Sequence, residues 1–309
     1  SRHRETPYDD FQHQPLLPNK YSQLGPGMAW GDVDGVGDND FFLGSGAGHH
    51  SRLQFNEENG FFLLGSNDAF KDESQYEDMA PLLFDADGDG DQDLYVVSGS
   101  YELPAESDAH RDRLYLNDGS GQFHRAPTDA LPNSTDAGSV VAACDFDRDG
   151  DLDLYEMNDR CYNGYAQNYL WVNDSGEGFV ESAAEWGLDL CFDAMGIGLS
   201  DLNRNGFMDM FMTNVPDGHC LLQGGCDGYM DVTGPSNTIS YQWGWGVIFD
   251  DLNHDTWPDL YIAHAGYVSF DRPNRLLMNE GDGSFLDVSD MSDASAGEVD
   301  SAAVVRADL

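Results

Sequence analysis

Five segments of this 309-residue chain place carboxylate and amide side chains at alternate positions of a nine-residue loop. Side-chain oxygens at positions 1, 3, 5 and 9, with the main-chain carbonyl of position 7, could surround one Ca²⁺ at roughly 2.3–2.6 Å. Glycine at position 6, present in four of the loops, allows the sharp turn that so short a loop needs. In chain order the candidate metal ligands are Asp32, Asp34, Asp38 and Asp40; Asp85, Asp87, Asp89, Asp91 and Asp93; Asp145, Asp147, Asp149, Asp151 and Asp153; Asp201, Asn203, Asn205, Phe207 and Asp209; and Asp251, Asn253, Asp255, Trp257 and Asp259.

The first loop differs from the others because Val36 at position 5 offers no side-chain oxygen, so we expect it to bind calcium weakly or through water. The loops resemble the first half of an EF-hand. An EF-hand, however, has a glutamate at position 12 and enters a helix, whereas position 12 counted from Asp85 is Val96, inside an apolar run. Solvated acidic turns are the alternative, and five copies in register argue against it. The sequence therefore predicts four to five bound Ca²⁺ ions.

The elements that would hold these loops repeat with them. The first Asp of each copy recurs at steps of 50 to 60 residues, and Asp308 begins a sixth copy, a period typical of solenoids, propellers and arrays. In each repeat a Gly-rich strand such as 195–199 precedes the loop, and an apolar strand such as 94–97 follows it. A third strand then enters a Gly-containing turn, as in 113–123, which suits a hairpin.

Four strands per repeat with no convincing helix predict an all-β fold, a β-propeller of four-stranded antiparallel blades. A sandwich or a jelly roll would not produce this period. We expect an extended N-terminal segment over 1–26, five complete blades over 27–300, and the first strand of an incomplete sixth blade over 301–309. An unpaired strand is an exposed edge, so the rest of the ring is expected from a second polypeptide or from the remaining part of the same precursor.

The repeats resemble the FG-GAP (VCBS) repeats of integrin α-subunit propellers and of many bacterial secreted proteins. Segments 16–27, 31–35, 76–80 and 111–118 are more specifically similar to the propellers of bacterial ASPIC/UnbV-type proteins, relatives of cartilage acidic protein. This resemblance implies a secreted or surface, adhesion-like propeller, usually with seven blades and often part of a larger multidomain protein.

The charge balance is strongly acidic, with 57 Asp and Glu against 14 Lys and Arg and a net charge of −43. Five bound Ca²⁺ ions would leave a net charge of about −33, so calcium binding does not account for the excess of acidic residues. Such a surface argues against nucleic acid and anionic membranes as partners. The sequence has no apolar run of 18 residues that would predict membrane insertion. Calcium sites of modest affinity fill where calcium is millimolar. We therefore expect a secreted, extracellular or cell-surface protein, with the periplasm as an alternative.

The five cysteines fit an oxidising compartment. We expect a local disulfide between Cys220 and Cys226, and a second between Cys161 and Cys191 of neighbouring blades. Cys144 is expected to be a buried free thiol. Five cysteines allow many other connectivities.

No arrangement of residues predicts catalysis. His264 is interpreted as an isolated structural histidine, and Trp243 and Trp245 are expected on one face of a strand, packing between blades or forming a platform for a sugar ring. The predicted function is a binding or adhesion module for a protein or glycan partner. The alternatives are a carbohydrate-active enzyme of the lyase kind and a structural piece of a multi-chain surface assembly.

Overall fold

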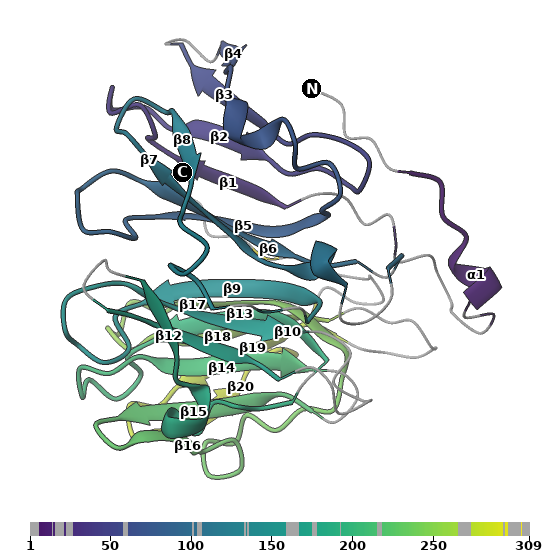
Figure 1. Ribbon diagram of the computed structural model, residues 1–309. Helices are drawn as coiled ribbons and strands as arrows, with labels where there is room; N and C mark the ends of the chain where they lie inside the picture. Colours follow the sequence, from purple (N-terminus) through teal and green to yellow (C-terminus); the bar gives the residue numbers. More distant parts are fainter. Residues whose placement is uncertain are drawn as a thin grey trace. The chain divides into compact units, whose positions relative to one another are not determined.

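The computed structural model describes residues 6–13, 15, 22, 27–57, 61–100, 102–103, 107–132, 134, 136–158, 167–174, 178–191, 193–214, 218–264, 273–292, 294–295 and 304. The chain is organised in two compact units, Ser1–Ser182 (unit 1) and Ala183–Leu309 (unit 2). Every strand of the described residues belongs to one of five four-stranded antiparallel sheets, which we call blades 1 to 5 in chain order (Figure 1). The prediction of an all-β chain built from four-stranded antiparallel blades is confirmed.

Unit 1 contains blades 1 to 3, and in each blade the strands are hydrogen-bonded to one another in chain order. Blade 1 is β1 (Met28–Gly31), β2 (Asp40–Leu43), β3 (Arg52–Asn56) and β4 (Phe62–Leu64). Blade 2 is β5 (Asp78–Phe84), β6 (Asp93–Ser98), β7 (Arg113–Asn117) and β8 (Phe123–Arg125). Blade 3 is β9 (Gly138–Cys144), β10 (Asp153–Asn158), β11 (Tyr169–Asn173) and β12 (Phe179–Glu181).

Unit 2 contains blades 4 and 5 with the same strand order. Blade 4 is β13 (Ala194–Ser200), β14 (Asp209–Asn214), β15 (Cys220–Gly225) and β16 (Gly228–Asp231). Blade 5 is β17 (Gly244–Asp250), β18 (Asp259–His264), β19 (Arg275–Asn279) and β20 (Phe285–Asp287).

Each acidic loop connects the first strand of its blade to the second. In blade 2 the pairing places Phe84 opposite Asp93, and in blade 5 it places Asp250 opposite Asp259. The ninth loop residue is thus the first residue of the second strand in every blade. Glycine at position 6 adopts a positive φ, as at Gly90 (96°) and Gly150 (105°), a conformation that side chains disfavour. The exception is Thr256 of blade 5, which holds the same conformation at φ 77°.

The cores lie between neighbouring blades of one unit. All six residues of β6 are buried, because its two faces contribute to different clusters: Leu94 and Val96 to one, Tyr95 and Val97 to the other. In unit 2 a comparable cluster joins Phe211 of blade 4 to Ile262 of blade 5. Second strands buried on both faces explain the nearly continuous apolar runs of the sequence.

Blade 1 differs from blade 2 in leaving one face exposed. Ala29, Phe42 and Leu53 pack into the core, while Trp30 on the opposite face of β1 is 54% exposed. The Trp30 ring stacks on Phe41 with centroids 4.5 Å apart, and it meets the edge of Phe62 at 5.9 Å. These three rings and their exposed neighbours Met28 and Leu64 form what we call the aromatic face of blade 1.

One expectation about the rest of the chain needs correction. The segment predicted to be extended includes the short helix α1 (Asp10–His13), and a second, α2 (Ala183–Trp186), follows blade 3. Residues 301–309, apart from Val304, lie outside the described residues, so the sixth-blade strand stays a prediction. None of the described helices is long and apolar enough to cross a membrane.

The local disulfide expected in blade 4 is wrong. Cys220 begins β15 and is buried, whereas Cys226 lies in the turn after β15 and is exposed, and both are free thiols. Six steps along an extended strand separate the two residues by about 20 Å, far beyond the span of a disulfide. Cys144 is a buried free thiol as predicted. Cys161 is not among the described residues, so its pairing with Cys191 stays a prediction.

Candidate calcium sites

The ninth residue of each loop holds the loop to the body of its blade. In blade 2, Asp93 is 1% exposed, and its Oδ2 accepts a hydrogen bond from the Ala86 amide (2.8 Å) while its Oδ1 accepts one from the Asn117 amide (2.8 Å). One carboxylate thereby joins the start of the loop to the end of the third strand. The equivalent pairs of bonds recur at Asp40, Asp153, Asp209 and Asp259.

The first and third residues shape the loop through their own backbone. Asp85 Oδ2 accepts the amide of Gly90 at position 6 (3.0 Å), and Asp87 Oδ1 accepts that of Asp89 (3.2 Å). The same two bonds occur in all five loops. Asn203 and Asn253 replace aspartate at position 3 in unit 2 without changing them, because an amide oxygen accepts as a carboxylate oxygen does.

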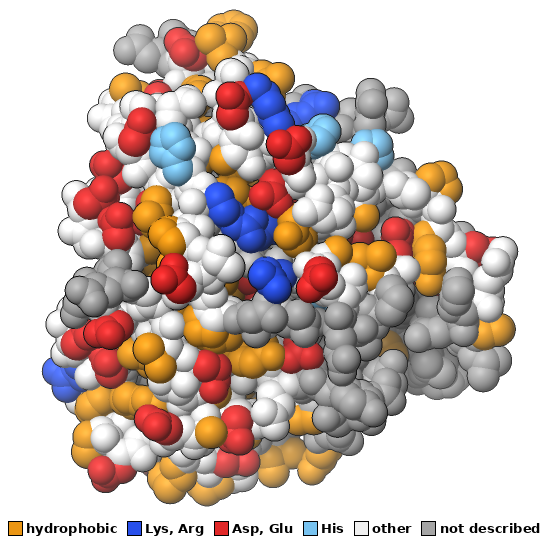
Figure 2. All heavy atoms as spheres, in the orientation of Figure 1, with side chains coloured by type: hydrophobic (Ala, Val, Ile, Leu, Met, Phe, Trp, Pro, Cys, Tyr) orange, Lys and Arg blue, Asp and Glu red, His pale blue; other side chains and the backbone are white. Residues whose placement is uncertain are grey.

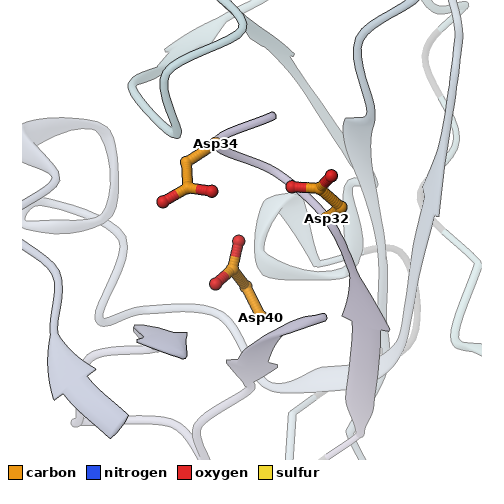
Figure 3. Close-up of side chains that lie close together, drawn as sticks. All are labelled: Asp32, Asp34 and Asp40. Atoms are coloured by element: carbon orange, nitrogen blue, oxygen red, sulfur yellow. The ribbon is translucent and has the colours of Figure 1, made fainter. Parts of the chain in front are cut away.

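These restraints gather three carboxylates in each loop of unit 1. Oxygens of positions 1, 3 and 9 lie within 4.8 Å of one another in three groups: Asp32, Asp34 and Asp40; Asp85, Asp87 and Asp93; and Asp145, Asp147 and Asp153. Figure 3 shows the first group, whose carboxylates face a common space. The structure therefore brings together the first, third and ninth of the predicted ligand positions.

The predicted ligands at positions 5 and 7 are placed differently. Asp89 and Asp149 are outside the three-carboxylate groups, and each accepts the amide of its own position 7 through Oδ1 at 2.9–3.0 Å. Phe207 and Trp257 donate their amides to position 5 in the same way. Their roles as ligands, through side chains at position 5 and carbonyls at position 7, stay predictions.

The electrostatics of the groups suit a hard cation. Burial raises the pKa of the Asp93 and Asp153 carboxyls to about 6, against the lowering effect of the two amides that each accepts. In the first loop, Oδ1 of Asp32 and of Asp38 is buried and has no hydrogen-bond partner among the described residues. Crowded, partly buried carboxylates repel one another, and an all-oxygen donor set is what Ca²⁺ binds. The residues present therefore fit calcium, including the first loop, where Val36 made it least expected.

In unit 2 the two loops are linked by an arginine. The Arg204 guanidinium of the blade 4 loop donates from Nη2 to the carbonyl (2.7 Å) and hydroxyl (2.6 Å) of Thr256 in the blade 5 loop. It also lies 3.8 Å from the centre of the Trp257 ring, a cation–π contact. Burial raises the pKa of Asp209 in blade 4 to about 6 as well.

Two asparagines that the sequence analysis did not single out also position the loops. The Asn117 side chain of blade 2 donates to the Val33 carbonyl in the blade 1 loop (2.8 Å). Asn173 of blade 3 donates in the same way to Ala86 in the blade 2 loop (2.9 Å). Both are buried at the end of a third strand. In both blades the asparagine stands one residue before the aspartate of the turn, and this recurrence in the sequence could have identified the two residues.

His264 is not isolated, as the sequence had suggested. Its Nε2 lies 3.1 Å from Nε2 of His219, and the two buried rings are stacked. The Asn214 amide donates to His219 Nδ1 (3.3 Å), and His264 Nδ1 lies 2.9 Å from the Pro273 carbonyl. One set of neutral tautomers satisfies all of these bonds, and burial lowers the pKa of His219 to about 3. The pair is explained as a structural link.

A buried ion pair lies at the start of blade 2. Arg113 and Asp78 are each at most 2% exposed and form a salt bridge. The Arg113 guanidinium also lies 4.2 Å from the centre of the Tyr76 ring, and its Nε donates to the Ser98 hydroxyl (3.2 Å). Asp78 Oδ2 accepts the Ser45 amide (2.9 Å) of blade 1. The pair therefore ties blade 2 to blade 1.

The aromatic pair at β17 lies in irregular backbone. The pairing of β17 with β18 shifts register between Gly244 and Val247. This interrupts the alternation on which a common face for Trp243 and Trp245 depends. Their platform role stays a prediction.

Residues 85–156 match the family model of the FG-GAP-like repeat. The matched stretch contains the loops of blades 2 and 3. No curated protein matches the chain. The narrower resemblance to ASPIC/UnbV-type proteins stays a prediction.

Solved structures with similar architecture are distant in sequence. They include an Agrocybe aegerita lectin that recognises non-reducing terminal N-acetylglucosamine (17% identity, TM-score 0.49, 84% of this chain and 64% of the lectin). YCF48 bound to a D1 peptide is 9% identical with a TM-score of 0.48, and the match covers 84% of this chain and 67% of YCF48. A putative exo-β-1,3-galactanase from Bifidobacterium bifidum is 8% identical with a TM-score of 0.41, and the match covers 84% of this chain and 85% of that protein. The chain thus spans less than two thirds of the lectin. What the comparisons support is an FG-GAP-like repeat within an all-β chain of four-stranded blades.

Proposed function

We propose that this chain is a calcium-stabilised binding module of the β-propeller class, acting outside the cytoplasm on a protein or glycan partner. The observation that carries the proposal is the recurrence of a three-carboxylate group at the same place in blades 1, 2 and 3. A Ca²⁺ ion at each group would tie the first strand to the second, and the ninth residue extends that tie to the third. Calcium bound only by the folded state stabilises it by RT ln(1 + [Ca²⁺]/Kd) per site.

The acidic composition supports the same role. Nineteen of the 57 acidic residues lie in the five loops, where their mutual repulsion destabilises the calcium-free form. Millimolar calcium is found outside the cytoplasm, where sites of modest affinity are filled. We therefore place the protein in a secreted, extracellular or cell-surface setting, or in the periplasm.

A partner polypeptide is supported by the aromatic face of blade 1. Strands β1 and β5, and β5 and β9, pack against each other within unit 1, so blade-on-blade packing is the interface that this chain already uses. The face that carries Trp30 is a sheet surface of the same kind, and exposed aromatic patches commonly mark interaction sites. We infer that a further four-stranded blade covers it.

Native mass spectrometry of the purified protein, with and without EDTA, tests both parts of the proposal. We expect the mass in calcium to exceed the EDTA mass by four or five Ca²⁺ ions. We also expect binding of the completing polypeptide, when it is supplied, to be lost in Trp30→Lys. A protein that takes up no calcium would contradict the proposed role.

A carbohydrate-active enzyme is the second candidate, favoured by one pair of buried carboxyls. Glu156 is fully buried, and its Oε2 accepts the Tyr95 hydroxyl (2.6 Å) and the Trp171 indole (3.2 Å). Burial and the neighbouring Asp112 raise the pKa of Glu156 well above its usual value. A carboxyl with a raised pKa is suited to act as a general acid. Release of sugar from a polysaccharide panel, lost in Glu156→Gln, would support this candidate over the binding module.

A further inference from the structure

A cavity of about 590 Å³ lies in unit 1 against blade 2. Its wall comes from the segment before β5, the start of β7, the end of β8 and the residues that follow β8. This volume falls within the range of small-molecule sites. The charged side chains of the wall are Glu73, Asp108, Arg111, Asp112 and Arg125. None of them is one of the proposed calcium ligands.

Arg111 has one buried donor that no described residue uses. Its Nε is buried without a hydrogen-bond partner in the described part of the chain. Its ion pair with Asp108, at 3.9 Å, is loose, and the Asp108 side chain is 97% exposed. Such an exposed ion pair contributes little to the stability of the fold. A buried N–H without a hydrogen-bond partner, in contrast, lowers that stability. A ligand that accepts from this guanidinium would remove that cost.

Arg125 brings a second guanidinium to the same wall. Its Nη1 donates to Glu73 Oε1 (3.0 Å), and its guanidinium carbon lies 5.3 Å from the centre of the Tyr115 ring. These contacts hold the side chain in place while 35% of it stays exposed. The chain has only 14 basic residues in 309, so two arginines on one cavity are unusual for it. On the face shown in Figure 2, Lys and Arg side chains lie among Asp and Glu rather than in a continuous basic area.

The remaining wall supplies hydrogen-bond acceptors and apolar surface. Asp112 is 2% exposed, and its carboxylate accepts the Ser98 amide (2.8 Å) and the Ser134 hydroxyl. Burial raises the pKa of Asp112 to about 6. Leu114 and Leu131 line the cavity with Tyr76. Carboxylates that accept hydrogen bonds from hydroxyl groups, beside apolar side chains that cover C–H groups, suit a polyhydroxylated ligand.

We propose that this cavity binds a sugar acid, with the ligand carboxylate on Arg111 and Arg125 and the ligand hydroxyls on Glu73 and Asp112. The planar fork of a guanidinium matches a carboxylate with two parallel hydrogen bonds. The apolar side chains then cover the C–H face of the ring. The inference rests on the proposed binding function and names its ligand class.

Isothermal titration calorimetry of the calcium-loaded protein in 0.15 M NaCl tests the site, with D-glucuronate, D-galacturonate and D-glucose as probes. We expect a uronate to bind and glucose to give no detectable heat. Arg111→Gln should weaken uronate binding about tenfold or more, because a hydrogen bond to a charged group is lost. Arg111→Lys should also weaken it, since lysine keeps the charge but lacks the fork. Lys71→Gln is the matched control, because Lys71 is 63% exposed, is not part of the wall and carries the same charge.

Three results would overturn the inference: no uronate binding by the wild-type protein, equal binding of glucose, or unchanged affinity in Arg111→Gln. Unfolding midpoints in calcium show whether each variant is folded, and Arg111→Lys serves if Arg111→Gln is not. Calcium counting on the same samples separates the two proposals. A protein that binds calcium but no uronate contradicts the sugar-acid site alone, whereas one that takes up no calcium contradicts the proposed function.

Discussion

Asp87→Asn should change the stability of unit 1 in opposite directions with and without calcium. Asp87 Oδ1 accepts the Asp89 amide (3.2 Å), and asparagine can keep that bond. Asn203 holds the equivalent amide in blade 4, so the loop tolerates this side chain. The substitution therefore removes one negative charge from the group and leaves the loop geometry intact.

Without calcium the variant should be the more stable protein. Oxygens of Asp85, Asp87 and Asp93 lie within 4.8 Å of one another. Two unit charges at that distance repel by about 1 kcal/mol in a water-like dielectric. Removing one of the three charges relieves two such pairs, and salt screening reduces the gain. We expect a net gain of about 1 kcal/mol, which raises the unfolding midpoint of a unit of this size by about 2–4 °C.

With calcium the same change should destabilise. A site held at a hundredfold excess of calcium over its Kd contributes about 2.7 kcal/mol. If loss of one charged ligand leaves the site largely empty, that stabilisation disappears while the gain of about 1 kcal/mol remains. The net loss of about 1.7 kcal/mol lowers the unfolding midpoint by about 3–7 °C. The sign of the effect, more than its size, identifies a metal site.

Thermal unfolding followed by circular dichroism at pH 7.5, in EDTA and in excess calcium, measures both effects. Asp129→Asn is the control, because Asp129 is exposed on the same unit outside the loops and loses the same charge. It should shift the midpoint little and equally in both buffers. If Asp87→Asn lowers the midpoint equally in EDTA and in calcium, the carboxylate has a structural role and the calcium interpretation of this loop is wrong.

Three further changes have outcomes that the geometry determines. Calcium affinity should fall as the pH drops from 7.5 to 5, because burial raises the pKa of Asp93 and Asp153 to about 6 and a protonated carboxyl does not bind the ion; calcium titrations that give the same affinity at both pH values would contradict this. Asp149→Ala should lower the unfolding midpoint in calcium and barely change it in EDTA, because without the ion the substitution removes only a solvent-exposed hydrogen bond, from the Asp151 amide to the Asp149 carboxylate. An equal loss in both buffers would contradict this prediction. Arg113→Met should lower the free energy of unfolding, measured in urea, by about 3–5 kcal/mol, because it leaves the buried Asp78 carboxylate unpaired. Adding Asp78→Asn should recover part of the loss. A double variant no more stable than Arg113→Met alone would refute the reasoning.

The repeat in the sequence was enough to predict the strands, their order and the loop positions 1, 3 and 9 whose carboxylates lie together in unit 1. The reason is physical: the nine-residue loops and the apolar strands are local patterns, and each repeat forms its own antiparallel sheet. The free thiol of Cys144 was predictable in the same way, from its place at the end of a strand. The Cys220–Cys226 pairing was wrong because sequence proximity says nothing of the distance along an extended strand.

Contacts between blades could not be read from the sequence. Asn117 and Val33 are 84 residues apart, and His219 and His264 are 45 apart, so nothing local links them. The cavity wall likewise combines Glu73 with Arg111 and Arg125 only because the segment before β5 lies beside β7 and β8. The sequence by itself determined the repeating blade and its carboxylate loop, since these depend on neighbours along the chain. Packing of one blade on the next decided which side chains became buried, paired or left free to meet a ligand, because it sets distances that no local pattern encodes.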